Sequence, residues 1–189
     1  MKQTITYKQF EPEDFAGVIE LGNAVHGDNY LDVEKTQSLY EASYHHGINA
    51  SFVAYDQDEL VGFRLTQAAG KWNIDQWCTP ESWQSDTSST CYFKSNTVNA
   101  EYRGYGIGSN LLKLSIDNAK KQGATAGLAH IWLASPGNSA FKYFSKCGGK
   151  LVKEHPNRWA QWCIDDGYVC PVCIEGCSCI AAEMIIHFD

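Results

Sequence analysis

The sequence has no run of about 18 consecutive apolar residues, so it predicts no membrane-spanning helix and no membrane partner. Its first residues, Met1-Lys-Gln-Thr, lack the apolar segment of a secretory signal peptide, and we expect a cytoplasmic protein. Basic residues are also scarce, because 15 Lys and Arg stand against 22 Asp and Glu, for a net charge of −7. Binding nucleic acid requires a basic face, so this balance argues against a nucleic acid partner. An acidic surface favours cationic ligands such as amines.

Internal repeats and low-complexity tracts are absent too, and 189 residues suffice for one domain but not comfortably for two. The patterns predict strands near 5–9, 50–54, 60–65, 92–98, 127–134, 150–154 and 180–188, and helices near 15–21, 31–44, 107–122 and 138–146. We therefore predict a mixed α/β fold in a single domain, 1–189, with insertions at about 66–91 and 156–179. The first insertion holds Trp72, Trp77 and Trp83, which either cover a functional site or pack on the sheet.

The most informative stretch is Asn96–Gly108, where an Arg-x-x-Gly-x-Gly turn joins a strand to an amphipathic helix. Glycines let the backbone approach a ligand closely, and successive N–H groups can converge on an anion. The N-terminal end of the following helix adds partial positive charge at the same place. The turn differs from the Gly-x-Gly-x-x-Gly dinucleotide fingerprint and lacks the Gly-Lys-Ser/Thr ending of a nucleotide P-loop. It predicts a pyrophosphate-binding turn of another kind.

This turn resembles motif A of the GNAT N-acetyltransferase superfamily, which holds the pyrophosphate of acetyl-CoA. Residues 136–148 resemble the family's motif B helix, and residues 5–14 resemble its first strand and helix. The resemblance covers most of residues 3–155 and the final strand. It implies a central, mostly antiparallel sheet flanked by helices, in which strands 92–98 and 127–134 are parallel neighbours that splay apart around the pantetheine arm.

The resemblance also implies which residues bind acetyl-CoA. Main-chain groups of Thr97, Val98 and Ala100 would contact the pantetheine, and the Val98 N–H would polarise the thioester carbonyl as an oxyanion donor. The pyrophosphate would lie on the turn formed by Arg103, Gly104, Tyr105, Gly106, Ile107 and Gly108, and Asn138 would contact the pantetheine or the phosphate end.

Family members often carry a tyrosine in the motif B helix that protonates the departing thiolate. Counting from Asn138, that position holds Phe144, and Tyr143 lies one residue earlier. One residue turns a helix by about 100°, so Tyr143, our candidate acid, takes this role only if the local register shifts.

The general base is open, because no Asp or Glu lies within 92–98, where some family members carry theirs. The candidates are Asp75, Glu81, Asp86 and His130. Each of them can equally be a surface group or a structural partner.

Eight cysteines is a high number for a chain that we expect to be cytoplasmic, and five of them fall between Cys163 and Cys179. The segment Cys170-Pro-Val-Cys173-Ile-Glu-Gly-Cys177-Ser-Cys179 contains a Cys-Pro-x-Cys knuckle of the kind that binds zinc. Its spacing matches neither paired zinc knuckles nor the common iron–sulfur patterns. Reduced thiols, or a disulfide such as Cys170–Cys173, are the alternatives.

Together these features predict an N-acetyltransferase that moves acetyl from acetyl-CoA to a primary amine by direct attack, with a small cationic acceptor. One alternative is an acyl-CoA-binding domain with little turnover, in which the cysteine insertion senses metal or redox state. Another is a protein N-acetyltransferase, which would need a shallow, open acceptor groove. The expected partners are acetyl-CoA and the amine, and the chain is expected to be a monomer or a homodimer.

Overall fold

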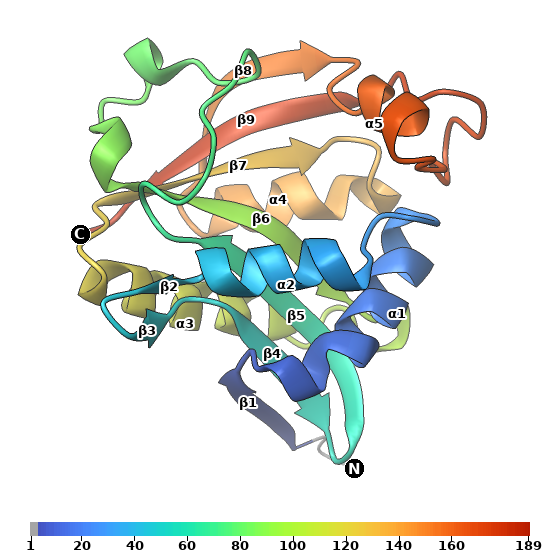
Figure 1. The fold of residues 1–189 in the computed structure, drawn as a ribbon. Coiled ribbons are helices and arrows are strands. Elements are labelled where there is room, and N and C mark those ends of the chain that lie inside the picture. Colours follow the sequence, from blue (N-terminus) through green and yellow to red (C-terminus); the bar gives the residue numbers. More distant parts are fainter. Residues whose placement is uncertain (1–3) are drawn as a thin grey trace.

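A seven-stranded sheet forms the centre of the computed structural model, which describes residues 4–189 (Figure 1). Its strand order is β1-β4-β5-β6-β7-β9-β8. The strands are β1 (Ile5–Gln9), β4 (Phe52–Asp56), β5 (Glu59–Gln67), β6 (Thr90–Val98), β7 (Ala126–Trp132), β8 (Lys150–Pro156) and β9 (Ile180–His187). Every neighbouring pair is antiparallel except β6 and β7. The predicted mostly antiparallel sheet with one parallel pair is confirmed.

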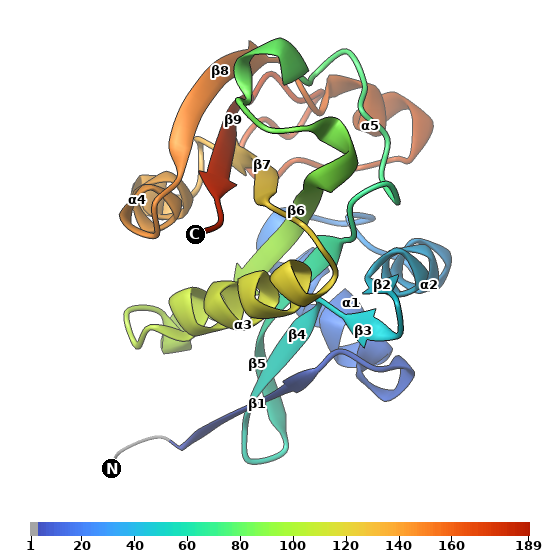
Figure 2. The same ribbon diagram turned by 90° about the vertical axis from the view of Figure 1, so that its left-hand side faces the viewer.

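Helices cover both faces of this sheet. Helices α1 (Phe15–His26) and α2 (Val33–Ala42) lie on one face, and α3 (Ile107–Lys121) and α4 (Ser139–Lys146) lie on the other, as the two views together show (Figure 2). A two-stranded ribbon, β2 (Tyr44–His45) and β3 (Ile48–Asn49), lies apart from the main sheet. Within residues 4–189, no helix is long and apolar enough to cross a membrane.

Helix α1 continues beyond the end that the sequence predicted. We expected Gly22-Asn23 to stop it, but it runs to His26, and Gly27 at φ +110° is its C-cap. A Cβ on Gly22 would lie 2.9 Å from Leu31 Cδ1 and 3.3 Å from Phe63 Cζ. Gly22 therefore permits close packing inside the helix rather than ending it, and the extra turn carries His26 towards β6.

The 66–91 insertion is anchored to the sheet by two of its tryptophans. Trp83 is fully buried, and the Trp72 ring stacks on Tyr92 of β6 with centroids 4.8 Å apart. Two short 3₁₀ turns, Pro80–Ser82 and Thr87–Ser89, give the segment its only helical structure. Trp72 and Trp83 therefore pack on the sheet and do not cover a functional site.

A buried carboxylate ties the same insertion to β9. Glu183 accepts hydrogen bonds from the Thr79 main-chain N–H at 2.8 Å, from Trp83 Nε1 at 2.6 Å and from His155 Nε2 at 2.7 Å. Burial acts to raise the pKa of Glu183, but these donors outweigh it and hold the pKa below its usual value. The Glu183 carboxylate thus acts as a structural hydrogen-bond acceptor that links the insertion to β9.

The 156–179 insertion contains a short helix, α5 (Ala160–Asp165), where the sequence analysis expected no element. The insertion leads from β8 back to β9 and lies beside the C-terminal end of α1 (Figure 1). Main-chain N–H of Val169 donates to the carbonyl of Asp28 at 3.2 Å. A Cβ on Gly27 would lie 2.1 Å from the Val169 carbonyl oxygen, so only glycine allows this contact.

Candidate active site

Strands β6 and β7 pair over only three residues and then separate. The pairs are Thr90 with Ala126, Cys91 with Gly127 and Tyr92 with Leu128. Beyond them lies a cleft of about 430 Å³, with walls formed by α1, β6, the start of α3, β7, α4 and the 156–179 insertion. The parallel strands thus separate as the resemblance implied.

A β-bulge lies in β6 just beyond the last paired residues. Leu65 of β5 pairs with Ser95 and Thr66 pairs with Phe93, so Lys94 is an extra, unpaired residue. Its side chain lines the cleft, with Nζ 4.4 Å from the ring centroid of Trp162. Burial lowers the pKa of Lys94 to about 8, and the positive charges of Arg158 and Lys35 act in the same direction.

The ladder between β5 and β6 decides which backbone groups of β6 face the cleft. Asn99 N–H donates to Val61 O at 2.9 Å, and Gly62 and Phe63 lie opposite Val98 and Thr97. Bonded and non-bonded pairs alternate in an antiparallel ladder. The main chain of Thr97 is therefore bonded to β5, whereas the N–H of Val98 points the other way, towards the gap that β7 leaves.

The predicted anion-binding turn has an open, glycine-dependent backbone. Gly104 has φ +84° and Gly106 has φ +79°, and a Cβ at either position would meet no atom within 4 Å. Gly106 is the N-cap of α3, so the N–H groups of the first helical turn have no partner within the helix. Arg103 donates through Nε to the Val98 carbonyl at 3.3 Å and so folds back along the same edge.

Of the residues predicted to bind acetyl-CoA, six line the cleft: Val98, Arg103, Gly104, Gly106, Ile107 and Gly108. Thr97 and Ala100 precede the turn without lining the cleft, and Tyr105 points outward with 66% of its surface exposed. Asn138 also lies outside the lining, but its Oδ1 is buried and has no hydrogen-bond partner among residues 4–189.

Tyr143 and Phe144 point in different directions from α4. Phe144 is buried in the core, and Tyr143 faces the cleft. The Tyr143 hydroxyl accepts a hydrogen bond from Arg64 Nη2 at 2.6 Å and donates one to the Gly108 carbonyl at 3.2 Å. Asn138 has a left-handed backbone (φ +53°) and is the N-cap of α4, which starts at Ser139.

Arg64 is a cleft residue that the sequence analysis missed. It is 2% exposed, and no carboxylate among residues 4–189 forms an ion pair with it. Burial raises the pKa of Tyr143, and the nearby Arg64 charge opposes that rise. A charged residue within the apolar stretch 60–65 was the signal that could have identified it.

His26 and Tyr30 form the α1 side of the cleft. His26 Nε2 lies 2.8 Å from Thr97 Oγ1, and the Tyr30 hydroxyl donates to Ser95 Oγ at 2.8 Å. Burial lowers the pKa of His26 to about 4, so its imidazole is neutral at pH 7. The sequence analysis missed His26 because it ended the helix at Gly22.

Among the four candidate bases, His130 alone lines the cleft. Its Nε2 donates to the Trp77 carbonyl at 2.5 Å, so its Nδ1 accepts from the Tyr92 hydroxyl at 2.8 Å. Burial lowers its pKa to about 4. No Asp or Glu among residues 4–189 lines the cleft, so Asp75, Glu81 and Asp86 lie outside it.

A second, outer pocket adjoins the cleft and shares Tyr30, Lys94 and Trp162 with it. Three carboxylates line it, from Asp32, Glu34 and Asp166, and they outnumber its cations, Lys35 and Lys94. Lys35 Nζ lies 4.0 Å from Asp32 Oδ2 and 3.5 Å from Asp166 Oδ2, so two of these carboxylates are paired with it.

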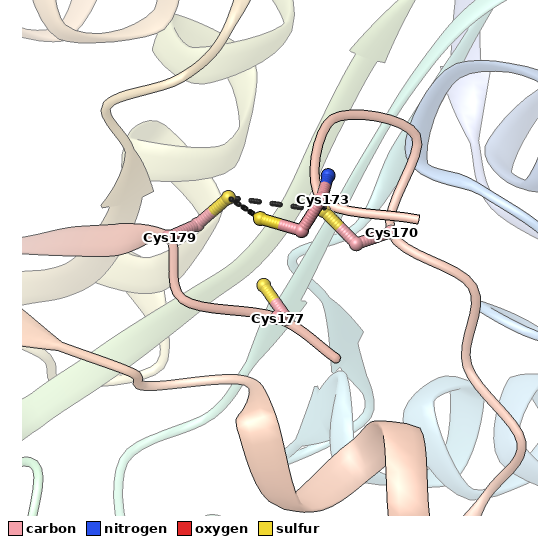
Figure 3. Close-up of side chains that lie close together, drawn as sticks. All are labelled: Cys170, Cys173, Cys177 and Cys179. Carbon is pink, nitrogen blue, oxygen red and sulfur yellow. Dashed lines mark hydrogen bonds between the residues drawn. The ribbon is translucent and has the colours of Figure 1, made fainter. Parts of the chain in front are cut away.

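The four cysteines Cys170, Cys173, Cys177 and Cys179 come together beside this cleft, which Cys177 also lines (Figure 3). Their Sγ atoms all lie within 4.8 Å of one another. The eight cysteines, all within residues 4–189, are free, so the alternative disulfide Cys170–Cys173 is not formed.

The acetyltransferase (GNAT) family model matches residues 18–148, more than half of the chain. The chain belongs to the acetyltransferase (GNAT) family and is an enzyme of the N-acetyltransferase class. A search of curated protein sequences returns no match.

Solved structures with the same fold cover nearly the whole chain. The acetyltransferase yncA from Salmonella typhimurium, described as putative and solved with acetyl-CoA, has TM-score 0.69 and 19% identity over 98% of this chain and 95% of its own. Ard1 from Thermoplasma volcanium has TM-score 0.70 and 14% identity, over 98% of each chain. Naa50 from Arabidopsis thaliana, bound to the bisubstrate analogue CoA-Ac-MVNAL, has TM-score 0.64 and 19% identity over 97% and 99%.

The glycine turn yields a first prediction. Saturating acetyl-CoA, at about 100 times its dissociation constant, should stabilise the wild-type protein by about 2.7 kcal/mol. Gly106→Glu should abolish this gain because a carboxylate would enter the anion-binding turn. The control is Gly123→Glu at the other end of α3, since Gly123 also has positive φ (+96°) and open space around it. The stabilisation of each variant by acetyl-CoA is measured from thermal melts with and without the ligand. If acetyl-CoA stabilised Gly106→Glu as much as Gly123→Glu, the glycine turn would not be the pyrophosphate site.

Lys94 yields a second prediction. Its folded pKa of about 8 lies below the ordinary 10.5, so between these values the unfolded chain binds more protons and stability rises with pH. Below pH 8 the buried charge is a penalty, and Lys94→Met should then raise stability by about 1 kcal/mol, or roughly 2–4 °C in Tm. The difference from wild type should shrink as the pH rises from 8 to 10. Lys113→Met, on the exposed face of α3, should show no such pH-dependent gain.

Proposed function

We propose that this protein transfers the acetyl group of acetyl-CoA to a small, cationic primary amine by direct attack. The observation that carries the proposal is the convergence of the glycine turn, the Val98 N–H and the Tyr143 hydroxyl on the one gap between β6 and β7. An anion site, an oxyanion donor and a proton donor in one cleft are what acyl transfer from a thioester requires.

The donor half of the reaction uses the α3 side of the cleft. The pyrophosphate would accept hydrogen bonds from the N–H groups at the start of α3, and Arg103, which lines the cleft, would add its charge. The pantetheine would run along the free edge of β6, because the main chain there is released from β7 after Tyr92. Asn138 Oδ1 is buried without a partner next to the cleft-lining residues Pro136 and Ser139, and it would have to become exposed to accept from an amide N–H of the donor.

The Val98 N–H would donate to the thioester oxygen as it gains negative charge in the tetrahedral intermediate. Such a fixed donor costs no reorganisation during the reaction and stabilises the developing charge. When the C–S bond breaks, the Tyr143 hydroxyl would protonate the leaving thiolate. Arg64 supports this step, because its hydrogen bond orients the hydroxyl and its unpaired charge stabilises the tyrosinate that forms.

The acceptor would enter through the outer pocket, where Glu34 would attract an ammonium ion, whereas Asp32 and Asp166 are already paired with Lys35. Attack requires the neutral amine. The environment that lowers the pKa of Lys94 to about 8 would also lower that of a bound alkylammonium, through the same burial and the charge of Lys94 itself. The proton can then leave to water along the outer pocket, so a carboxylate base in the cleft is not required.

A peptide amine is the second candidate acceptor, since Naa50, which has the same fold, was solved with a CoA–peptide analogue. The 156–179 insertion favours the small acceptor. Trp159, Trp162 and Tyr168 from this segment line the cleft, and their bulk would leave less room for a peptide than for a small amine.

A third prediction tests the acceptor class. With acetyl-CoA as donor, small diamines and polyamines should be acetylated with kcat/KM at least about tenfold above that of N-terminal peptides, a difference of roughly 1.4 kcal/mol. Glu34→Gln should raise KM for the cationic acceptors several-fold, since one attractive charge is worth about 1 kcal/mol at such a surface. Glu41→Gln, on the same helix but outside the outer pocket, is the control. Faster turnover of peptides would reverse the acceptor assignment, and acetyl-CoA binding with no turnover of any amine would favour a binding domain.

A fourth prediction concerns the proton donor. Tyr143→Phe removes only a hydroxyl and should lower kcat by about 10²-fold, while the dissociation constant of acetyl-CoA changes by less than about threefold. Tyr44→Phe loses a hydroxyl that bonds Glu11, away from the cleft, and should keep the wild-type rate. Single-turnover rates and acetyl-CoA binding measure the two effects separately. A Tyr143→Phe enzyme within about threefold of wild type would show that this hydroxyl is structural.

A further inference from the structure

The loop 170–179 buries its sulfur atoms and exposes its aliphatic side chains. Cys170, Cys177 and Cys179 are 1%, 4% and 7% exposed, whereas Val172 and Ile174 are 54% and 73% exposed. A loop that folded by the hydrophobic effect would do the reverse, because Ile and Val gain more from burial than a thiol does. The buried thiols do contact Trp132, Trp159 and Tyr168, but these apolar contacts leave Val172 and Ile174 in solvent and do not by themselves explain why the sulfur atoms are grouped.

The spacing of the sulfur atoms indicates what groups them. Cys179 Sγ lies 3.7 Å from Cys170 Sγ and 3.6 Å from Cys173 Sγ, and the four Sγ atoms point towards a common space (Figure 3). A disulfide requires about 2.05 Å. Four sulfurs around one tetrahedral zinc at about 2.3 Å lie about 3.8 Å apart. These two separations match the edge of a tetrahedral thiolate site, and all four Sγ atoms lie within 4.8 Å of one another.

We propose that Cys170, Cys173, Cys177 and Cys179 together bind one zinc ion, which holds the 156–179 insertion in its folded shape. Four thiolates around one ion give a closed, four-coordinate site, which is the arrangement of structural rather than catalytic zinc. Binding would release the thiol protons and add a cross-link to the small apolar cluster that these cysteines form with Trp132, Trp159 and Tyr168.

Neighbouring donors fit thiolate ligands. The Cys173 main-chain N–H points at Cys170 Sγ across the Cys-Pro-Val-Cys turn, with N and S 3.5 Å apart, and Ser178 Oγ lies 3.7 Å from Cys173 Sγ. Hydrogen bonds of this kind hold metal ligands in position and stabilise their negative charge. Cys163, in the same insertion, instead directs its Sγ to the Trp159 carbonyl at 3.9 Å and does not belong to the group.

The metal would also shape the acceptor wall, by which we mean the cleft-lining residues Trp159, Trp162 and Tyr168 of the 156–179 insertion. This consequence rests on the proposed function. Just before Cys170, the Tyr168 hydroxyl donates to the His26 carbonyl at 2.8 Å, and Val169 bonds Asp28. Asn29 Nδ2 donates to the Gly167 carbonyl at 2.9 Å. These contacts join the loop to the end of α1, whereas the glycine turn that serves acetyl-CoA lies at the start of α3. Loss of zinc should therefore disturb acceptor binding and leave donor binding intact.

The test begins with the metal itself, in full-length protein purified without added metal or chelator. Elemental analysis should find about one zinc per chain, and cobalt substitution should produce the visible absorption of a tetrahedral thiolate site. Cys173→Ser, at the most exposed of the four positions, should lose both signals, and Cys163→Ser should keep both. No metal in wild type with four freely titrating thiols, or a disulfide among them, would overturn the site. Iron in place of zinc would keep the ligands and correct the metal.

Removal of zinc from the wild-type protein by a chelator tests the acceptor wall without a substitution. We expect a lower Tm, a KM for the amine raised about tenfold or more, and an acetyl-CoA dissociation constant within about twofold of the metal-loaded value. Re-addition of zinc should restore the KM. Stoichiometric zinc whose removal leaves acceptor kinetics unchanged would retain the metal site and refute its role in the wall. Absence of amine turnover in loaded protein would instead count against the proposed function.

Discussion

The short pairing of β6 with β7 is the constraint on which the active site depends. Three paired residues hold the two halves of the sheet together, and the bulge at Lys94 then turns β6 away from its neighbour. Because β5 still satisfies alternate backbone groups of β6, the remaining ones, at Val98 among them, face the gap and need another partner. The sheet is thus continuous on one side of the cleft and incomplete on the other, and an extended ligand that donates and accepts hydrogen bonds can complete it.

The electrostatics of the cleft are the second constraint. Arg64 is buried without a carboxylate, Lys94 keeps a charge beside Trp162, and the carboxylates lie outside, in the outer pocket. A cleft of this kind stabilises anions, namely a pyrophosphate, an oxyanion and a departing thiolate, and it disfavours an ammonium ion. The same charges therefore help the donor at every stage and promote loss of the amine's proton.

The sequence predicted the glycine turn and its flanking strand and helix much better than the other walls of the cleft, and the reason is local. The glycine turn, the strand before it and the helix after it are contiguous, so their geometry follows from neighbouring residues. Cleft residues such as His26, Arg64 and Lys94 come from separate elements, and only the tertiary fold brings them together. One local error is instructive. Glycine often ends a helix, but Gly22 lies inside α1 and allows close packing against Leu31.

The contrast between the contiguous glycine turn and the other walls of the cleft also affects how the two proposed substrate sites can vary. The proposed donor site is built mainly from main-chain groups, which are insensitive to side-chain identity. The proposed acceptor wall comes from the 156–179 insertion, which is held by a small cluster of cysteines and aromatic residues and by three contacts to residues 26–29. Such a small cluster gives limited local stability, so a metal bound there would add order to this wall. Changes in such a loop can alter acceptor choice at little cost to acetyl-CoA binding, because the two sites share the cleft but not the elements that hold their shape.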